Sequence, residues 1–361
     1  MRKLVSYIVA LVALVVGGGY TTSAQELRLG ADFTTLFDNK EYATMTYDVS
    51  GTLFGARLTP KIGVQWAGYN ELMFAADMLQ DFGHNSRFLS DINVQLYYAY
   101  RAPRVKAIAG IFPREEMRGL RSLLFFDRSY RYYNNRIGGV LARFENPKFG
   151  DSYVEFAFDY TGMRDYTTRE AFMLMSSGLL PITNWFYLGY DMILGHYAKD
   201  YNPETIDGVV DNGLIVPYLG FNPSFAGFDI DIRVSYVQAL QRDRIVGDIW
   251  HFPAGSEIYA GITRWGVTLA NQIYAGRPQM PFWDKYGSQL YYGSPMYRAE
   301  KGIYEVVSLS YGNRFFNDTL IVEAGINAEY DGTGWGTRQW LQVSVDLDYG
   351  INLKRKEKTI E

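Results

Sequence analysis

The sequence contains no cysteine, which excludes a disulfide framework and any thiolate metal site. Histidine is scarce, with three widely separated residues in 361, so we expect no metal centre. The formal net charge is only −4, which gives no broad basic field for nucleic acid. No phosphate-binding loop or nucleotide fingerprint occurs, and we expect no cofactor. Nothing after residue 24 approaches the roughly 18 consecutive apolar residues of a transmembrane helix.

Aromatic residues and glycine are abundant instead. Aromatics make up 16% of the chain, led by 30 tyrosines, and tyrosine gathers where an apolar layer meets water. The 36 glycines fit a chain with many turns. The mean hydropathy of −0.15 is low for a helical membrane protein. It is compatible with a membrane β-barrel, because half of every barrel strand faces a polar interior.

The N-terminal segment differs from the rest of the chain. Arg2 and Lys3 precede an almost unbroken apolar run over residues 4–16, and small residues lead up to Ala24. This order of a basic region, an apolar region and a small-residue cleavage site is typical of a secretory signal peptide. A retained anchor is the alternative, but the run is short for a membrane span. We therefore predict that residues 1–24 are a signal peptide.

The rest of the chain repeats a stretch of about ten alternating apolar and polar residues followed by a turn. The last stretch shows the pattern well. Its apolar face comprises Leu341, Val343, Val345, Leu347, Tyr349 and Ile351, and its polar face comprises Gln342, Ser344, Asp346, Asp348 and Asn352. Successive side chains of a strand point to opposite sides of a sheet, so each such strand has one apolar and one polar face.

Sixteen such strands are predicted. They span 26–37, 43–67, 71–83, 90–101, 105–113, 136–145, 151–162, 169–181, 184–197, 208–222, 227–242, 255–264, 266–276, 302–315, 319–331 and 337–353. Short connections alternate with long ones, and the long ones include 114–135, 198–207, 243–254 and 277–301. A soluble β-sandwich also alternates, but the export signal, the long strands and the aromatic strand ends favour a membrane barrel.

We therefore expect an all-β protein: a transmembrane antiparallel up-and-down β-barrel of about sixteen strands over residues 25–353. Residues 354–361 form a short charged periplasmic tail in this interpretation. The first strand follows the signal peptide directly, so no N-terminal plug domain is expected. The long connections are expected on the outer side of the membrane.

These features together resemble the porins, the general diffusion channels of the Gram-negative outer membrane, and the porin-like barrels common in the Bacteroidota. The segment 349–353 is a partial match to the aromatic ending of such barrels, and the charged tail that follows it departs from the pattern. The resemblance implies an outer-membrane location and passive passage of small polar solutes. It also implies contact with outer-membrane lipid and lipopolysaccharide, and it leaves a homo-oligomer open.

The third connection on the long-loop side, 114–135, joins the fifth and sixth predicted strands and is the candidate pore constriction. At helical spacing Arg114, Arg118 and Arg121 share one face, and Met117, Leu120 and Leu124 share another. A short helix could pack its apolar face on the wall and direct arginines into the lumen, which favours anions. The candidate constriction residues are Arg114, Arg118, Arg121, Arg128, Glu115 and Glu116. Alternatively, the arginines pair with inward carboxylates or bind lipopolysaccharide phosphate outside.

Further polar residues are expected on the lumen side of the strands. The candidates are Asp229, Asp231, Glu323, Asp346 and Asp348. The connection 277–301 is rich in aromatic residues, which could stack on sugar rings, although a self-packed cap over the barrel mouth is the favoured interpretation.

An enzyme is the rival class. His84, His196 and His251 all fall near the outer rim of the predicted barrel, and Asp200 or Asp248 could complete an acid–base pair. No nucleophile motif accompanies them, so we expect a channel and no enzyme. The alternatives are a non-conducting barrel that binds a surface or secretion partner and, less favoured, a hydrolase with its site at the rim.

Overall fold

The computed structural model describes residues 25–83, 87–165, 168–199, 208–245 and 247–353. The predicted signal peptide at 1–24, the predicted tail at 354–361 and His84 lie outside the described residues.

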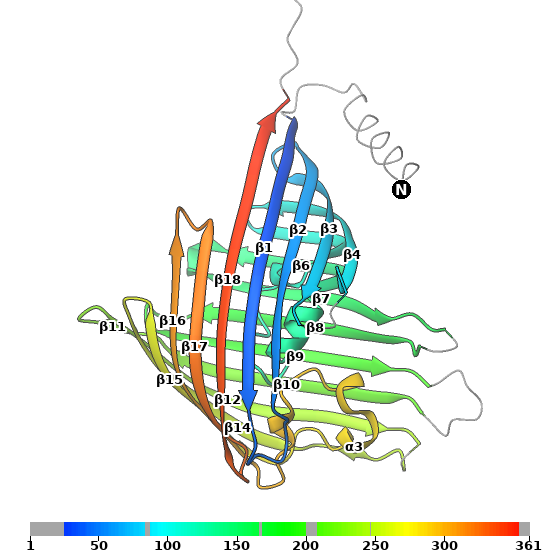
Figure 1. The fold of residues 1–361 in the computed structure, drawn as a ribbon, viewed down its shortest axis with the longest axis vertical. Coiled ribbons are helices and arrows are strands. Elements are labelled where there is room, and N and C mark those ends of the chain that lie inside the picture. Colours follow the sequence, from blue (N-terminus) through cyan, green and yellow to red (C-terminus); the bar gives the residue numbers. More distant parts are fainter. Residues whose placement is uncertain (1–24, 84–86, 166–167, 200–207, 246, 354–361) are drawn as a thin grey trace, which may run out of the picture.

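Sixteen long strands form one closed antiparallel barrel (Figure 1). The first eight are β1 (Gln25–Glu41), β2 (Gly51–Trp66), β3 (Asn70–Asp81), β4 (Asp91–Ala102), β5 (Val105–Pro113), β6 (Arg136–Asn146), β7 (Ser152–Gly162) and β8 (Ala171–Pro181). The others are β9 (Phe186–Tyr197), β10 (Val210–Phe221), β12 (Phe228–Asp243), β14 (Ala254–Arg264), β15 (Val267–Gly276), β16 (Ile303–Phe315), β17 (Leu320–Tyr330) and β18 (Trp335–Asn352). Two-residue strands β11 (Ser224–Phe225) and β13 (Trp250–His251) extend the sheet.

Pairing of the first strand with the last closes the barrel. β1 pairs with β18 from Glu26 opposite Asn352 to Glu41 opposite Thr337. Every pairing between neighbouring long strands is antiparallel, and the fold class predicted from the alternating pattern is confirmed.

The period-two pattern explains which side chains face outward. On β18 Leu341 and Leu347 are exposed, as lipid-facing residues of an isolated chain must be, while Arg338 is buried inside. The strand therefore presents apolar side chains to the membrane and polar ones to the lumen.

All short turns lie at one rim of the barrel, together with the N-terminal end of β1 and the C-terminal end of β18 (Figure 1). One of the two-residue turns joins β14 to β15 through Trp265 and Gly266, which both have positive φ, at 53° and 80°. Two such residues match the right-handed twist of the flanking strands. We call this end the short-turn rim and the opposite end the long-loop rim.

The largest difference from the predicted strands concerns residues 43–50, which the sequence pattern assigned to a strand over 43–67. In the structure they leave the sheet and turn inward. The carboxylate of Asp331 accepts hydrogen bonds from the backbone N–H groups of Thr46 and Tyr47, at 2.8 and 3.1 Å. Ser50 accepts another from the N–H of Tyr42, at 2.8 Å. Side chains therefore satisfy amides that a strand would have paired with its neighbour.

Three connections of the long-loop rim, 42–50, 114–135 and 277–301, fold into the barrel and pack together; we call them the plug. They contain the short helices η1 (Arg114–Glu116), α2 (Arg128–Tyr133), α3 (Trp283–Tyr286), η3 (Gly287–Gln289) and η4 (Pro295–Arg298). Helix α3 is labelled in Figure 1. A sixth short helix, η2 (Pro147–Phe149), belongs to a short turn. The loops of the barrel itself therefore fill much of its lumen.

A continuous apolar core joins the plug to the wall. Its plug residues include Met117, Leu120, Phe126, Met280, Tyr291 and Met296, and its wall residues include Met73, Met173, Ile193 and Val216. Burying these side chains inside the barrel gives the plug its hydrophobic stabilisation.

Within the described residues, none of the helices has the length and apolar character needed to cross a membrane.

Candidate functional site

Two wall carboxylates hold the tip of the 114–135 loop. The backbone N–H groups of Arg118 and Gly119 donate to Glu155 Oε1, at 2.9 and 2.7 Å. The next amide, of Leu120, donates to Asp191 Oδ1 at 2.9 Å, and Leu120 itself has a left-handed φ of 60°. Consecutive amides that converge in this way form a concave binding site for anions. Here the anions are two side chains of the barrel wall, Glu155 on β7 and Asp191 on β9, and they hold the loop in its inward position.

The helix predicted across 114–124 is wrong. Helix η1 ends at Glu116, and the next helix of this loop, α2, begins at Arg128. The reason is competition for the amides, because Glu155 and Asp191 bind the N–H groups that an α-helix would use. Gly119 also packs so closely that a Cβ atom there would collide with Ser177 and Asp191. The three apolar residues of the predicted face are buried, but without helical geometry.

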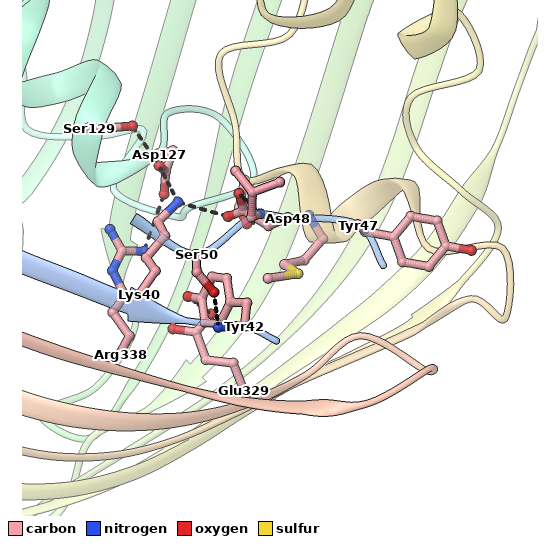
Figure 2. A network of polar contacts seen from close by, with 12 residues as sticks. Lys40, Tyr42, Tyr47, Asp48, Ser50, Asp127, Ser129, Glu329 and Arg338 are labelled. Carbon is pink, nitrogen blue, oxygen red and sulfur yellow. Dashed lines mark hydrogen bonds and ion pairs between the residues drawn. The ribbon is translucent and has the colours of Figure 1, made fainter. Parts of the chain in front are cut away.

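An ion network ties this loop to the first and last strands. Asp127 lies 3.6 Å from Lys40 Nζ and 3.4 Å from Arg338 Nη1, and Lys40 also pairs with Asp48 at 2.7 Å (Figure 2). Arg338 in turn donates to Asp38 at 2.7 and 2.5 Å. Burial alone would raise the pKa of Asp127, but the charges of Lys40 and Arg338 outweigh it and hold the pKa below its usual range. The carboxylate is therefore ionised at neutral pH.

The 277–301 loop is anchored by tyrosine hydroxyls. Tyr286 donates to Asp243 at 2.7 Å, Tyr291 donates to Gln241 at 2.6 Å, and Tyr297 donates to Glu257 at 2.5 Å. These rings are almost fully buried. They have no exposed face for stacking on a sugar, and the loop packs inside the wall instead of only capping the mouth.

The two large loops also bind each other through their backbones. Asp127 N–H donates to Tyr292 O at 2.7 Å, and Ser294 N–H donates to Leu123 O at 2.8 Å. Between them Gly293 lies against the carbonyl of Leu124, where a Cβ atom would collide. Segments almost 170 positions apart therefore approach as closely as neighbouring strands, which glycine permits.

The predicted constriction residues occupy different environments. Arg114 pairs with Asp159 at 2.7 Å, and Arg118 lies 3.6 Å from Glu145. The alternative in which loop arginines pair with wall carboxylates thus describes these two residues. Arg128 is turned toward the last strand, 4.0 Å from the ring centroid of Trp340.

Arg121 and Arg131 bind backbone carbonyls. Arg121 donates to the carbonyls of Met117 and Arg118, at 2.8 and 3.2 Å. One terminal nitrogen of Arg131 donates to the carbonyls of residues 120, 121 and 122, at 2.9, 2.6 and 3.2 Å. Burial, followed by the positive charges of Arg121 and Arg128, lowers the pKa of Arg131 to about 10. The sequence places Arg131 in the same arginine-rich loop but not among the candidate constriction residues, because its proximity to Arg121 depends on the loop fold.

The two glutamates of η1 also lie in different environments. Glu115 is exposed, whereas Glu116 accepts from Arg101 at 2.6 Å and from Lys106. Burial alone would raise the pKa of Glu116, but hydrogen bonds and charge from Arg101 and Lys106 lower it to about 2.

Two cavities lie on either side of this segment. One, of about 90 Å³, is lined by Arg114, Glu115, Met117, Gly119, Leu120, Arg121, Phe126, Arg131 and Asn135. The other, of about 330 Å³, is lined by Arg28, Lys61, Gln65, Tyr69, Glu71, Met73, Tyr97, Arg101, Glu116 and Asp348. Since Glu116 lines the second while its two neighbours line the first, the segment 114–117 separates them. We call them the arginine cavity and the vestibule.

The predicted lumen carboxylates lie on the inward faces of their strands and are mostly partnered. Asp346 lies 3.2 Å from Lys61, and Asp348 pairs with Arg28. Asp231 accepts from Tyr187 at 2.9 Å, and Asp229 accepts from Ser224 at 2.6 Å near the short-turn rim. Glu323 lies on the same face of β17 as the buried Glu329.

The described histidines lie at the long-loop rim. The register places Phe172, His196, Asp211 and Arg242 side by side on β8, β9, β10 and β12. His196 alternates with the buried Ile193 and Asp191, so it faces outward, toward lipid. Its Nδ1 lies 3.6 Å from Asp211, which also pairs with Arg242 and Arg244.

The predicted histidine pairs differ from this arrangement. Asp248 pairs with Arg242 at 3.3 Å and not with His251, whose ring packs edge-on against Phe282. Asp200 lies outside the described residues. In the described ranges, no cluster of three or more His, Asp and Glu residues could hold a metal ion.

The barrel is similar to solved porins. An anion-selective porin from Comamonas acidovorans has a TM-score of 0.50 and 11% identity, covering 90% of this chain and 100% of that one. OprB from Pseudomonas putida has a TM-score of 0.53 and 8% identity over 93% and 96% of the two chains. OccAB4 from Acinetobacter baumannii has a TM-score of 0.51 and 8% identity over 90% and 98%. The predicted porin-like fold and the location in the cell outer membrane are confirmed.

The sequence comparisons correct one prediction. No curated protein matches the chain. A sequence model of the family described as "Lipid A 3'-O-deacylase-type" matches residues 20–203, about half of the chain and all of β1 to β9. This is a family of enzymes, so the prediction that the protein is not an enzyme is wrong. The chain belongs to the lipid A 3'-O-deacylase-type family.

Proposed function

We propose that the barrel lets small polar solutes pass passively through a lumen that the plug narrows, with a preference for anions. The observation that carries this proposal is the pair Arg121 and Arg131, which bind carbonyls at the narrowed segment. Their charges are not neutralised by a carboxylate at ion-pair distance in the described part of the chain.

A count of charges supports the preference for anions. Three arginines and one glutamate line the arginine cavity, and Asp159 offsets one arginine from outside it. The balance stays positive by one charge. The vestibule is lined by three basic and three acidic side chains, so it adds no net charge. Charge at the narrow part of a pore acts within about one Debye length, near 8–10 Å, and therefore dominates selectivity.

The plug limits the size of the solute. Its apolar core runs from one side of the barrel to the other, so the path must follow the polar margin near Arg114 and Glu116. The exposed apolar side chains of the outer surface, such as Leu341 and Leu347, would contact outer-membrane lipid and lipopolysaccharide.

Planar-bilayer recording tests the proposal. Purified, heat-modifiable protein should give a small, steady conductance, and a salt gradient should give a reversal potential of the sign for anions. A folded protein that carries no current, or a cation-selective current, would refute the proposal.

A second candidate is hydrolysis of a lipid ester at the long-loop rim. The family match and the outward-facing pair of His196 and Asp211 favour it. Asp211 would orient the imidazole, and Nε2 would take a proton from an attacking hydroxyl or water and return it to the alcohol released from the ester. At this rim an outward side chain meets the membrane surface and not the lumen.

Lipid A from cells that express the protein tests this candidate. If it holds, lipid A loses its 3'-O-linked acyl chain in mass spectra, the His196→Ala variant abolishes the loss, and His251→Ala retains it. Unaltered lipid A in cells with the wild-type barrel in the outer membrane removes the candidate.

A further inference from the structure

We propose that the arginine cavity is a saturable binding site for a small organic carboxylate, held by Arg121 and Arg131. The inference deepens the proposed passage of anions by naming the class of solute. In this proposal the narrow segment binds its solute. A wider, water-filled pore would discriminate between solutes only by their size and charge.

Both guanidiniums retain donors for a ligand. Arg121 uses Nε and one terminal nitrogen for the carbonyls of Arg118 and Met117. Arg131 uses one terminal nitrogen for all three of its carbonyl partners. Their remaining N–H groups have no acceptor among the described residues, and the carbonyl contacts fix both planar groups in place. Two such preorganised groups suit a carboxylate, which accepts paired N–H bonds.

The positive charges of the cavity repel one another. The pKa of Arg131 is lowered by burial and then by its neighbours Arg121, Arg128 and Arg114, yet at about 10 it stays protonated at neutral pH. Only Arg114 of the three lining arginines has a carboxylate partner at ion-pair distance in the described part of the chain, Asp159. An entering carboxylate would relieve this repulsion, which gives binding a driving force beyond its hydrogen bonds.

The rest of the lining favours an organic anion. Met117, Leu120 and Phe126 are each at most 3% exposed and form an apolar wall. A carboxylate with a few methylene groups would bury them here, at about 0.8 kcal/mol per methylene, whereas inorganic phosphate has none to bury. A volume of about 90 Å³ limits the ligand to a small molecule.

One more lining group lacks a partner. The side-chain oxygen of Asn135 is buried and accepts no hydrogen bond from the described residues. Since the amide can be turned about its last bond, its NH₂ could instead donate to a bound carboxylate. Glu115 is the opposing group, because its exposed carboxylate lines the same cavity and repels an anion.

Titration calorimetry on the full-length protein in detergent tests the site. Butyrate should bind saturably, acetate more weakly, and choline not at all. The double variant Arg121→Gln with Arg131→Gln should weaken butyrate binding at least about tenfold, because two charge-assisted contacts are lost. Arg314→Gln, at the exposed short-turn end of β16, is the matched control and should leave binding unchanged.

A variant with a higher affinity for butyrate complements the double variant, because a misfolded protein would not bind butyrate more tightly. Glu115→Gln removes an exposed negative charge and should strengthen butyrate binding severalfold. The site is overturned if wild-type protein binds no butyrate, if the double variant binds it equally well, or if phosphate binds more tightly than butyrate. Bilayer recording is read separately: a protein that binds butyrate but carries no current retains the site and refutes the proposed passage.

Discussion

Replacing Glu155 with glutamine should release the 114–135 loop from the barrel wall. This carboxylate is 1% exposed and accepts the backbone N–H groups of Arg118 and Gly119, the hydroxyl of Ser177 at 2.7 Å and one nitrogen of Arg143 at 3.3 Å. Glutamine has the same shape but carries no charge, and its NH₂ would meet donors where an acceptor is needed.

The magnitude follows from the amide contacts. A hydrogen bond to a charged group contributes about 1.5–3 kcal/mol, and two backbone N–H groups donate to Glu155. Since glutamine retains one oxygen, we expect roughly half of the total to be lost, about 1.5–3 kcal/mol. The population of released loop should therefore rise about 10- to 100-fold, at about 1.4 kcal/mol per factor of ten.

Limited trypsin digestion measures that population, because cleavage after Arg118 or Arg121 requires the loop to leave the wall. Cleavage should accelerate in proportion to the released fraction, and single-channel conductance should rise. Glu145→Gln is the matched control: Glu145 accepts from Arg143 at 2.8 Å and meets the loop through the partly exposed Arg118 side chain at 3.6 Å, but no loop amide donates to it. A partly exposed ion pair contributes little, so cleavage should change less than about threefold. Equal trypsin resistance in wild type and Glu155→Gln would refute the anchoring role of the wall carboxylate.

Three further perturbations have defined outcomes. Gly293→Val should separate the two large loops, because its side chain would collide with the Leu124 carbonyl; trypsin cleavage near Arg121 should accelerate, and unchanged protection would contradict the close approach. Val343→Arg should hinder membrane assembly, since a mid-membrane charge on the lipid face costs about 2–4 kcal/mol, while Ser344→Arg on the lumen face should assemble; heat-modifiability on gels separates the two. The folded-state pKa of Asp127 is depressed, so its contribution is complete above the unfolded value near 3.9 and is lost as pH falls further. Conductance should thus stay constant from pH 8 to 5 and rise below about pH 4, and Asp127→Asn should already show the higher value at pH 7.

Much of the barrel could be predicted because strand alternation is a local property. The pattern around Val343 and Ser344 depends only on neighbouring residues and on the lipid on one side. Residues 43–50 were misassigned because the amides of Thr46 and Tyr47 are satisfied by Asp331, about 285 positions away, and no local pattern contains that contact.

The site could be predicted less well, for the same reason. Arg114, Arg118 and Arg121 have helical spacing, but Glu155 and Asp191 bind the amides that a helix needs. The sequence shows these two acids only as polar residues of separate strands. The enzyme family likewise left no local nucleophile motif, and the pair of His196 and Asp211 exists only through the register of β9 with β10.

The ion network also sets an order for assembly. Asp38 and Lys40 belong to β1, the first strand to leave the ribosome, and Arg338 belongs to β18, the last. Asp127 binds across the seam that these two strands form. A barrel still open at that seam offers the loop only half of its partners and leaves the buried charge of Arg338 unpaired. Docking of the 114–135 loop inside the barrel is therefore coupled to the pairing of β1 with β18, and the lumen is filled in the same step that closes the barrel.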